Sequence, residues 1–245
     1  MMKTKIPSSI TTHINSQFNF WLQQRERTGK KKPETAPKMR NTPFVTISRE
    51  YGCGGFEIAR ALASAINKQI KPLPEWVAYD RKVLEAVMDD LGLNEKLAHS
   101  LTSRERESMT ELFRGAFSDL PPRVVVYRKL AETVRTLACN GHVIIVGRAG
   151  RVITRELPRG YHVRIVAPRD WRVERVSCMI GITVKEAKKI VLDKNREREE
   201  FLKNYIKFDS AGCHNYHIVI NHAEYSSEQV TKLIIEGMKL RGFLK

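Results

Sequence analysis

The sequence predicts an α/β domain in which helices cover both faces of a parallel β-sheet. Two observations carry this expectation: strand-sized apolar segments recur along the chain, and segments with helical spacing separate them. Strands joined by helices usually run parallel and are buried on both faces. The expected strands are residues 44–47, 143–146, 162–167 and 217–221.

Apolar residues at intervals of three and four predict the helices between these strands. Asn140 and Gly141 mark the end of the helix before the second strand, because glycine readily adopts the left-handed backbone of a helix C-terminus. A long charged helical region follows the third strand, and a closing helix follows the last. The expected helices are residues 57–66, 83–91, 97–101, 125–137, about 171–208 and 228–239.

Residues 1–42 differ from the rest and predict a basic N-terminal extension and linker before a domain at residues 43–245. The extension carries 9 Lys/Arg and 2 Asp/Glu. It also contains four apolar residues at the spacing of a short amphipathic helix: Ile14, Phe18, Trp21 and Leu22. This helix could pack on the main domain, on a second protomer in a homodimer, or on another partner.

The composition excludes several classes of protein. Hydrophobic residues make up 42% of the chain, which is enough for a substantial core. The longest apolar stretches are too short to cross a bilayer, and the N-terminus lacks the features of a secretory signal. We therefore expect a cytoplasmic protein that does not bind membranes. Four scattered cysteines without a CxxC pair argue against a disulfide framework, and we expect no metal site built from protein ligands.

The formal net charge of +16 implies an anionic partner. Residues 1–42 contribute +7 of this charge and the remainder contributes +9. The partner could be a nucleotide, a nucleic acid or an acidic surface. We expect nucleotides rather than nucleic acid, because basic tails are commonly only solvated.

A glycine-rich turn, residues 51–55, connects the first strand to the first helix of the domain. In an α/β sheet this turn lies at the carboxyl edge of the strands, where ligands bind. Glycines let backbone N–H groups face an anion, and the helix N-terminus adds partial positive charge. The turn could also be a tight connection without a ligand. The expected phosphate-binding residues are Arg49, Gly52, Cys53, Gly54, Gly55 and Phe56.

The turn matches the Walker A pattern GxxxxGK[ST] only in part. Gly55 stands where the lysine of that pattern should be. The lysine normally brings positive charge to the β- and γ-phosphates, so another cation would have to replace it. Arg49, at the end of the strand, is the nearest candidate.

Residues 47–59, ISREYGCGGFEIA, resemble the opening ISREYGSGGREIA of the cytidylate kinase-like family. Further segments resemble that family in the same order along the chain, so that the resemblance covers about residues 43–243. These segments are YDR at 79–81, VGRA at 146–149 with HVRIVAP at 162–168, DKNR at 193–196 with FLKNY at 201–205, and YHIVIN at 216–221 with SSEQV at 226–230.

This resemblance implies a P-loop NTPase-type fold with an insertion that binds a nucleoside monophosphate and a helical lid at about residues 169–208. It also implies transfer of the ATP γ-phosphate to CMP or dCMP, with Mg²⁺. Two residues depart from the family pattern. Phe56 replaces an arginine that could have compensated for the missing lysine, and Cys53 replaces a serine.

By the same resemblance, Asp80 binds the acceptor nucleoside, while Arg81 and Arg148 bind its phosphate. Asp80 could instead, or also, cap the following helix, and Arg148 could be a surface residue in a turn. Arginines suit phosphate because their planar guanidinium groups bind its oxygens in pairs. In the lid, Arg175 and Arg196 are the expected catalytic residues with Arg148, and Arg172 and Arg198 are the expected supporting ones.

The lid arginines also have a plainer interpretation, as an exposed helix held by internal ion pairs. Two functions therefore stay open. The first is a nucleoside-monophosphate kinase that uses ATP and Mg²⁺. The second is a nucleotide-binding protein of kinase fold that has lost transfer activity and serves as a sensor or partner-binding module.

Overall fold

The protein forms a five-stranded parallel sheet with the strand order β2-β3-β1-β4-β5, as a computed structural model shows. The structure describes residues 8–29, 42–100, 123–206 and 208–245. The strands are β1 (Phe44–Arg49), β2 (Val77–Tyr79), β3 (Val143–Val146), β4 (Gly160–Val166) and β5 (Ile218–Asn221). Because every neighbouring pair is parallel, all carboxyl ends meet at one edge of the sheet.

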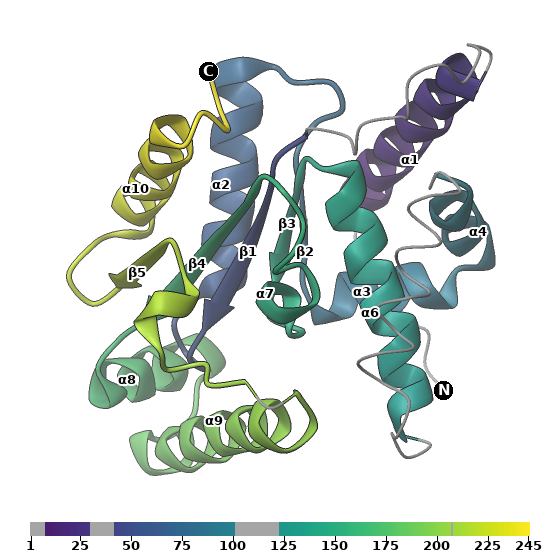
Figure 1. Ribbon diagram of the computed structural model, residues 1–245. Helices are drawn as coiled ribbons and strands as arrows, with labels where there is room; N and C mark the ends of the chain where they lie inside the picture. Colours follow the sequence, from purple (N-terminus) through teal and green to yellow (C-terminus); the bar gives the residue numbers. More distant parts are fainter. Residues whose placement is uncertain (1–7, 30–41, 101–122, 207) are drawn as a thin grey trace.

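Two hydrophobic layers bury the two faces of the sheet (Figure 1). Side chains alternate along β3: Val143 and Ile145 face one layer, and Ile144 and Val146 face the other. One layer is covered by α2 (Gly55–Ile70) and α10 (Ser227–Leu240). The other is covered by α1 (Ser8–Gly29), α3 (Arg81–Asp89), α4 (Leu91–His99), α6 (Arg123–Asn140) and the short α7 (Gly150–Ile153).

The helices α8 (Arg169–Ile180) and α9 (Val184–Ile206) lie beyond the carboxyl edge of the sheet, below it in Figure 1. They pack on each other through a small apolar cluster of their own, built from Val173, Val176, Ala187 and Val191. This pair occupies the segment in which a helical lid was expected, about residues 169–208, and its role as a lid stays a prediction. Gly181 adopts a left-handed backbone (φ 69°) and ends α8, so the expected long helical region consists of two helices.

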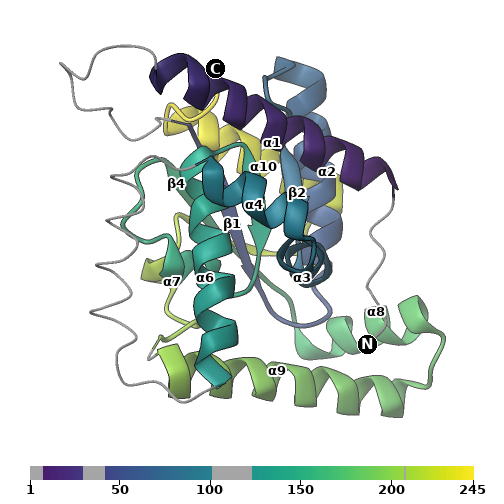
Figure 2. The same cartoon turned by 90° about the vertical axis from the view of Figure 1, so that its right-hand side faces the viewer.

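Helix α1 packs on the domain itself, which is one of the three arrangements the sequence left open. Figure 2 shows it running across the molecule beside α4. Ile14, Phe18 and Trp21 are almost completely buried in the same layer as β2 and α3. Gln17 donates hydrogen bonds to the carbonyls of Glu75 and His142, at 3.1 and 2.9 Å. The division of the chain at residue 43 stays a prediction.

The sequence predicted four of the five strands and missed β2. This strand has only three residues, so it leaves no periodic pattern. The helices expected at 83–91 and 97–101 are in fact α3 and α4, which meet at Asp90, and residue 101 lies outside the described residues. Among the described residues, no helix combines the length and the apolar character needed to cross a membrane.

Candidate functional site

Three glycines of the turn between β1 and α2 each lie against an arginine. A side chain at Gly52 would place its Cβ 3.0 Å from Arg172 Cβ. A side chain at Gly54 would approach the Arg175 guanidinium to 2.6 Å, and one at Gly55 would approach Arg49 Cγ to 3.0 Å. The glycines are therefore required by close packing as well as by backbone conformation, since Gly52 and Gly54 have φ values of 92° and 64°.

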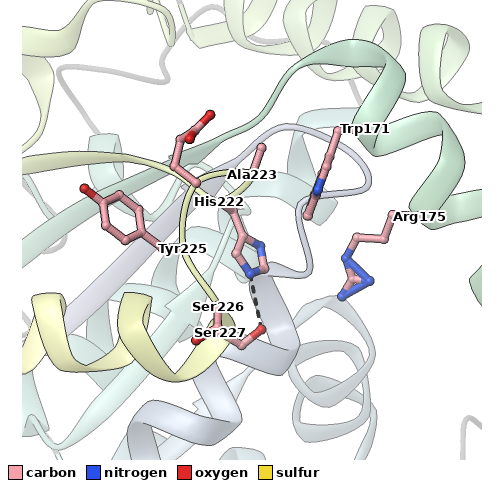
Figure 3. A pocket seen from close by; sticks show the side chains of 8 residues that line it. Trp171, Arg175, His222, Ala223, Tyr225, Ser226 and Ser227 are labelled. Carbon is pink, nitrogen blue, oxygen red and sulfur yellow. Dashed lines mark hydrogen bonds between the residues drawn. The ribbon is translucent and has the colours of Figure 1, made fainter.

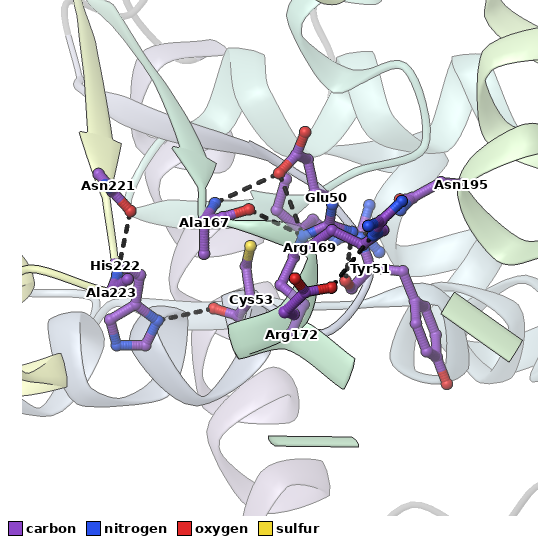
Figure 4. Close-up of polar contacts among 12 residues, drawn as sticks. Glu50, Tyr51, Cys53, Ala167, Arg169, Arg172, Asn195, Asn221, His222 and Ala223 are labelled. Atoms are coloured by element: carbon purple, nitrogen blue, oxygen red, sulfur yellow. Dashed lines mark hydrogen bonds and ion pairs between the residues drawn. The ribbon is translucent and has the colours of Figure 1, made fainter. Parts of the chain in front are cut away.

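Arg172 ties α8 to the turn through several protein partners (Figure 4). It is buried, with 7% exposure. Its Nε donates to the Ala167 carbonyl at 2.9 Å and lies 3.3 Å from Glu50, and its Nη1 donates to the Tyr51 carbonyl at 3.2 Å. Through these contacts Arg172 positions α8 and the turn relative to each other.

Arg175 and Arg196 lie in different surroundings, although both were expected to be catalytic. Arg175 lies over Gly54 and pairs with Glu57, and its guanidinium lies 5.9 Å from the Trp171 ring centre. Arg196 is exposed and pairs with Asp193 at 3.0 Å on the same helix. The structure therefore brings Arg175 to the turn and does not bring Arg196 there.

Arg198, two residues further along α9, faces the turn instead. Its Nη1 lies 3.5 Å from the carbonyl oxygen of Arg49, and its guanidinium lies 5.3 Å from the Tyr51 ring centre. Asn195, on the same side of α9, accepts a hydrogen bond from the Tyr51 N–H at 2.8 Å. Residues three apart share a helix face, whereas residues two apart do not. This periodicity explains why Arg198 faces the site and Arg196 does not.

Arg49, Arg148 and Arg198 form a cluster of positive charge at the carboxyl edge. The pKa of Arg49 is lowered to about 9, first because burial removes water from the guanidinium and then because Arg198 and Arg148 lie close by. Burial also lowers the pKa of Arg198, and Arg148 adds to that effect. Like charges held together in a partly dry site create a strong attraction for an anion.

The acceptor residues expected from the sequence lie on the α3 side of this cluster. Asp80 caps α3, because its side chain accepts the Val83 N–H at 2.9 Å, and its charge reaches Arg49 as well. Arg81 is exposed and pairs with Glu85 at 2.7 Å. Arg148 lies 3.7 Å from the same Glu85 carboxylate and has a left-handed backbone, with φ 52°. Strained backbone of this kind is common at functional sites.

Cys53 and Phe56 contribute packing and backbone to the turn. Cys53 is fully buried, and burial raises the pKa of its thiol to about 11, so the thiol stays protonated at neutral pH. Its carbonyl oxygen lies 2.9 Å from His222 Nδ1, which donates to it. Phe56 is partly buried and packs against both hydrophobic layers. Neither side chain supplies charge to the turn.

A cavity of about 520 Å³ opens beside the turn, between the start of α8 and the loop that leads from β5 into α10 (Figure 3). Trp171 and His222 form one wall, with ring centres 5.2 Å apart. Arg175 connects this cavity to the glycine turn. The lining residues are Trp171, Arg175, His222, Ala223, Glu224, Tyr225, Ser226 and Ser227.

The sequence did not predict this cavity or a role for His222. The available signal was position, because His222 directly follows the last strand and therefore lies at the carboxyl edge. Among the described residues, no group of three or more His, Cys, Asp or Glu side chains could hold a metal ion. The nearest acidic side chain to the turn from α2 is Glu57, which pairs with Arg175.

A parallel sheet with this strand order, a glycine turn lined by arginines and a helical lid define a nucleotide kinase-like protein. A sequence model of the cytidylate kinase-like family matches residues 44–224, and the chain belongs to that family. The match includes the glycine turn, the β3–α7 turn and the lid.

Individual relatives are distant. The chain is 26% identical over 158 residues to a cytidylate kinase of Aeropyrum pernix. This match covers 63% of this chain and 89% of the kinase. It is 24% identical over 159 residues to a uronate isomerase of Corynebacterium glutamicum, and this match spans only 30% of the isomerase and 62% of this chain. A crystal structure of an uncharacterised protein from Eubacterium ventriosum has a similar fold, with a TM-score of 0.62 and 20% identity over 81% of this chain and 98% of that one.

Proposed function

We propose that the protein transfers the γ-phosphate of ATP to CMP, dCMP or a related nucleoside monophosphate. The observation that carries this proposal is the meeting of Arg49, Arg148, Arg175 and Arg198 at one glycine turn. Phosphoryl transfer needs positioning and neutralisation of negative charge more than covalent help from the protein. Arginines from a strand, a turn and two lid helices suit both needs.

The cavity next to the turn suits the base of ATP. Its Trp171 and His222 rings offer flat surfaces for a heterocycle, and Arg175 leads from the cavity to the turn. The triphosphate would then lie over the backbone N–H groups at the N-terminus of α2, which attract anions. This orientation leaves the opposite side of the turn, with Asp80 and Arg148, for the acceptor monophosphate.

In the proposed reaction an oxygen of the acceptor phosphate attacks the γ-phosphorus of ATP. The bond from that phosphorus to the oxygen shared with the β-phosphate breaks, and ADP leaves with the electron pair. Arg148 would hold the attacking phosphate, and Arg175 and Arg198 would bind the transferred group as α8 and α9 close over it. For this, Arg175 must exchange Glu57 for phosphate oxygen.

Mg²⁺, when bound, neutralises charge on the β- and γ-phosphates. Kinases hold this ion through one or two carboxylates together with phosphate oxygens and water, so a preformed cage of protein ligands is not required. Glu57 fits that role by chemistry and by place, since it lies in the first turn of α2. The carboxylate would become available when Arg175 moves to phosphate.

The test is ADP production from ATP and Mg²⁺ with CMP, dCMP, UMP and AMP as acceptors. We expect turnover with a pyrimidine monophosphate, and Arg148→Ala should lower kcat/KM by at least about a hundredfold, because an attacking phosphate that is no longer held in line reacts that much more slowly. Arg155→Ala is the matched control. Arg155 lies just after α7 and pairs with Glu156, and its loss should leave turnover unchanged.

The alternative is a protein that binds nucleotides and does not transfer phosphate. It is favoured by the glycine at position 55 and by the carboxylate of Glu57, which occupies Arg175. ATP binding without ADP production for every acceptor would select this alternative. Absence of both binding and turnover would contradict both functions.

A further inference from the structure

Position 49 and position 55 hold residues that are interchanged relative to the Walker A pattern. In GxxxxGK[ST] the lysine stands six residues after the first glycine. In this chain an arginine, Arg49, stands at the place of the first glycine, and a glycine, Gly55, stands at the place of the lysine. Changing both residues would give GEYGCGK, which restores the pattern up to its lysine.

The structure shows that these two residues share one space. A side chain at Gly55 would place its Cβ 3.0 Å from Arg49 Cγ and 3.4 Å from Arg49 Cβ. At the other end of the arginine, a Cβ at Gly147 would lie 2.0 Å from Arg49 Nη1. The Arg49 side chain therefore runs from β1 past the start of α2 to the turn after β3, and both glycines are needed to admit it.

Arg49 and Arg172 differ in the partners that surround their guanidinium groups. Arg172 has two carbonyl acceptors and a carboxylate, whereas within residues 8–29, 42–100, 123–206 and 208–245 the Arg49 guanidinium has no ion-pair partner. The charged and titratable groups that act on it are Arg198, Arg148, Asp80 and Cys53. Two of these are cations, one is a carboxylate that caps α3, and the thiol is neutral.

We propose that Arg49 takes the place of the P-loop lysine and binds the β- and γ-phosphates of ATP, and that Gly55 is glycine because it must admit this side chain. The inference rests on the proposed function and names the residue that neutralises the donor phosphates. Arginine suits the role, because its planar guanidinium can bind two phosphate oxygens at once and stays charged when partly buried. A phosphate chain would also lie between Arg49, Arg148 and Arg198 and relieve their mutual repulsion.

The test is binding of ATP by isothermal titration to the full chain and to four variants: Arg49→Met, Arg49→Gly, Gly55→Lys and the double variant R49G/G55K. Losing one charge-assisted phosphate contact should weaken ATP binding by about tenfold to a hundredfold in both Arg49 variants. Gly55→Lys alone should not strengthen binding, because two cations would compete for one space. In the double variant, binding should return to within about threefold of the wild type.

Two controls make the result specific to phosphate. Adenosine, which lacks phosphate, should bind all variants equally, and inorganic tripolyphosphate should compete with ATP less well in the Arg49 variants. Arg128→Ala removes one arginine from an exposed face of α6, where Arg128 pairs with Glu132, and should leave ATP binding unchanged. Circular dichroism and urea unfolding would establish that each variant is folded before its binding is compared.

The outcomes separate this inference from the proposed function. Wild-type ATP binding that is unchanged in Arg49→Met would overturn the role of Arg49 and leave the kinase proposal standing. A folded double variant that binds ATP no better than Arg49→Gly would contradict the claim that a lysine at position 55 can replace Arg49. A wild-type protein that transfers no phosphate but loses ATP binding in the Arg49 variants would support the inference and contradict the kinase proposal. A wild type that binds no ATP would overturn both.

Discussion

At the scale of single residues, the site gathers positive charges that lie close together and are partly buried. The clearest case is Arg49, whose pKa is lowered to about 9 by burial and by neighbouring arginines. Between about pH 9 and the ordinary arginine pKa the folded state binds fewer protons than the unfolded state. Below pH 9 both states are protonated, so the cost of burying this charge is fully present, and constant, at neutral pH.

We therefore expect Arg49→Met to stabilise the folded protein while it weakens ATP binding. Methionine can follow the same path past Gly55 without a charge, and replacing a buried charge at a functional site commonly raises the free energy of unfolding by about 1 kcal/mol. Urea denaturation at pH 7 measures the change. A variant less stable than the wild type would show that Arg49 holds the turn together instead.

The lowered pKa of His162 predicts that the folded protein loses stability in acid. Its pKa is lowered to about 3, mainly by burial and further by Arg151 and His217, while its Nδ1 lies 2.8 Å from the Thr46 hydroxyl. The unfolded state binds the proton first as pH falls below about 6.5, so the stability present above that pH is lost progressively toward pH 3. His162→Gln should make the decline between pH 6 and pH 4 shallower by up to about 1.4 kcal/mol per pH unit. An unchanged slope would contradict this assignment.

For the arginines of the site, the sequence predicted which residues to consider but not what their side chains contact. Arg148 could be named because it follows a strand and a glycine, and the lid arginines could be named because their segment resembles the cytidylate kinase-like family. The contacts of each guanidinium could not be predicted, since Arg172 donates to carbonyls from two different segments and Arg196 pairs with Asp193 on its own helix. Such partners depend on tertiary packing, which periodicity does not encode.

At the scale of elements, two helices in different places both begin with an aspartate N-cap. Asp80 caps α3 and Asp90 caps α4, and each side chain accepts a backbone N–H, from Val83 at 2.9 Å and from Leu93 at 3.0 Å. Asp80 lies at the carboxyl edge with Arg49, and Asp90 does not act on that arginine. A comparison of Asp80 with Asp90 can therefore distinguish a role in helix capping from a role in the site.

We expect Asp80→Ala and Asp90→Ala each to lower the free energy of unfolding by about 1 kcal/mol, the usual contribution of a helix cap. Asp80→Asn should keep that stability, since asparagine caps as well as aspartate. If Asp80 also binds the acceptor, Asp80→Asn should raise the KM for the monophosphate while Asp90→Ala leaves it unchanged. Equal KM values in both variants would reduce Asp80 to a cap. Thermal unfolding and ADP production measure the two effects.

Elements with strong periodicity were predicted well, and short or divided ones were not. The strands β1, β3, β4 and β5 are apolar runs that can be read directly from the chain. β2 has three residues, and its place at the sheet edge depends on its pairing with β3. The break between α8 and α9 depends on the left-handed backbone of Gly181. Any glycine in a helical stretch can end a helix in this way, so its presence alone does not predict a break.

At the scale of the whole molecule, the N-terminal helix completes the core on the β2 side. Phe18 is fully buried, and its ring stacks on Trp21 with centres 5.2 Å apart. Gln17 also accepts the hydroxyl of Tyr79 at 2.7 Å, so α1 satisfies polar groups of β2 as well as covering apolar ones. The fold therefore depends on a segment that the sequence presented as an extension.

We expect Phe18→Ala to lower the free energy of unfolding by about 3–5 kcal/mol, the usual cost of removing a buried aromatic side chain. Gln23→Ala, at an exposed position of the same helix, should change stability by less than about 0.5 kcal/mol. Urea denaturation of both variants measures the difference. If both behave like the wild type, α1 does not contribute to the stability of the domain.

The close approach of Arg49 to Gly55 has a consequence for the history of this family. A single substitution at either position leaves the turn with two cations in one space or with none, and we expect neither intermediate to bind phosphate better than the two paired states. The two positions should therefore covary among relatives: sequences with arginine at 49 should have glycine at 55, and sequences with glycine at 49 should have lysine at 55. A lineage that moved from one state to the other would have had to pass through a weakened protein or through a duplicated gene.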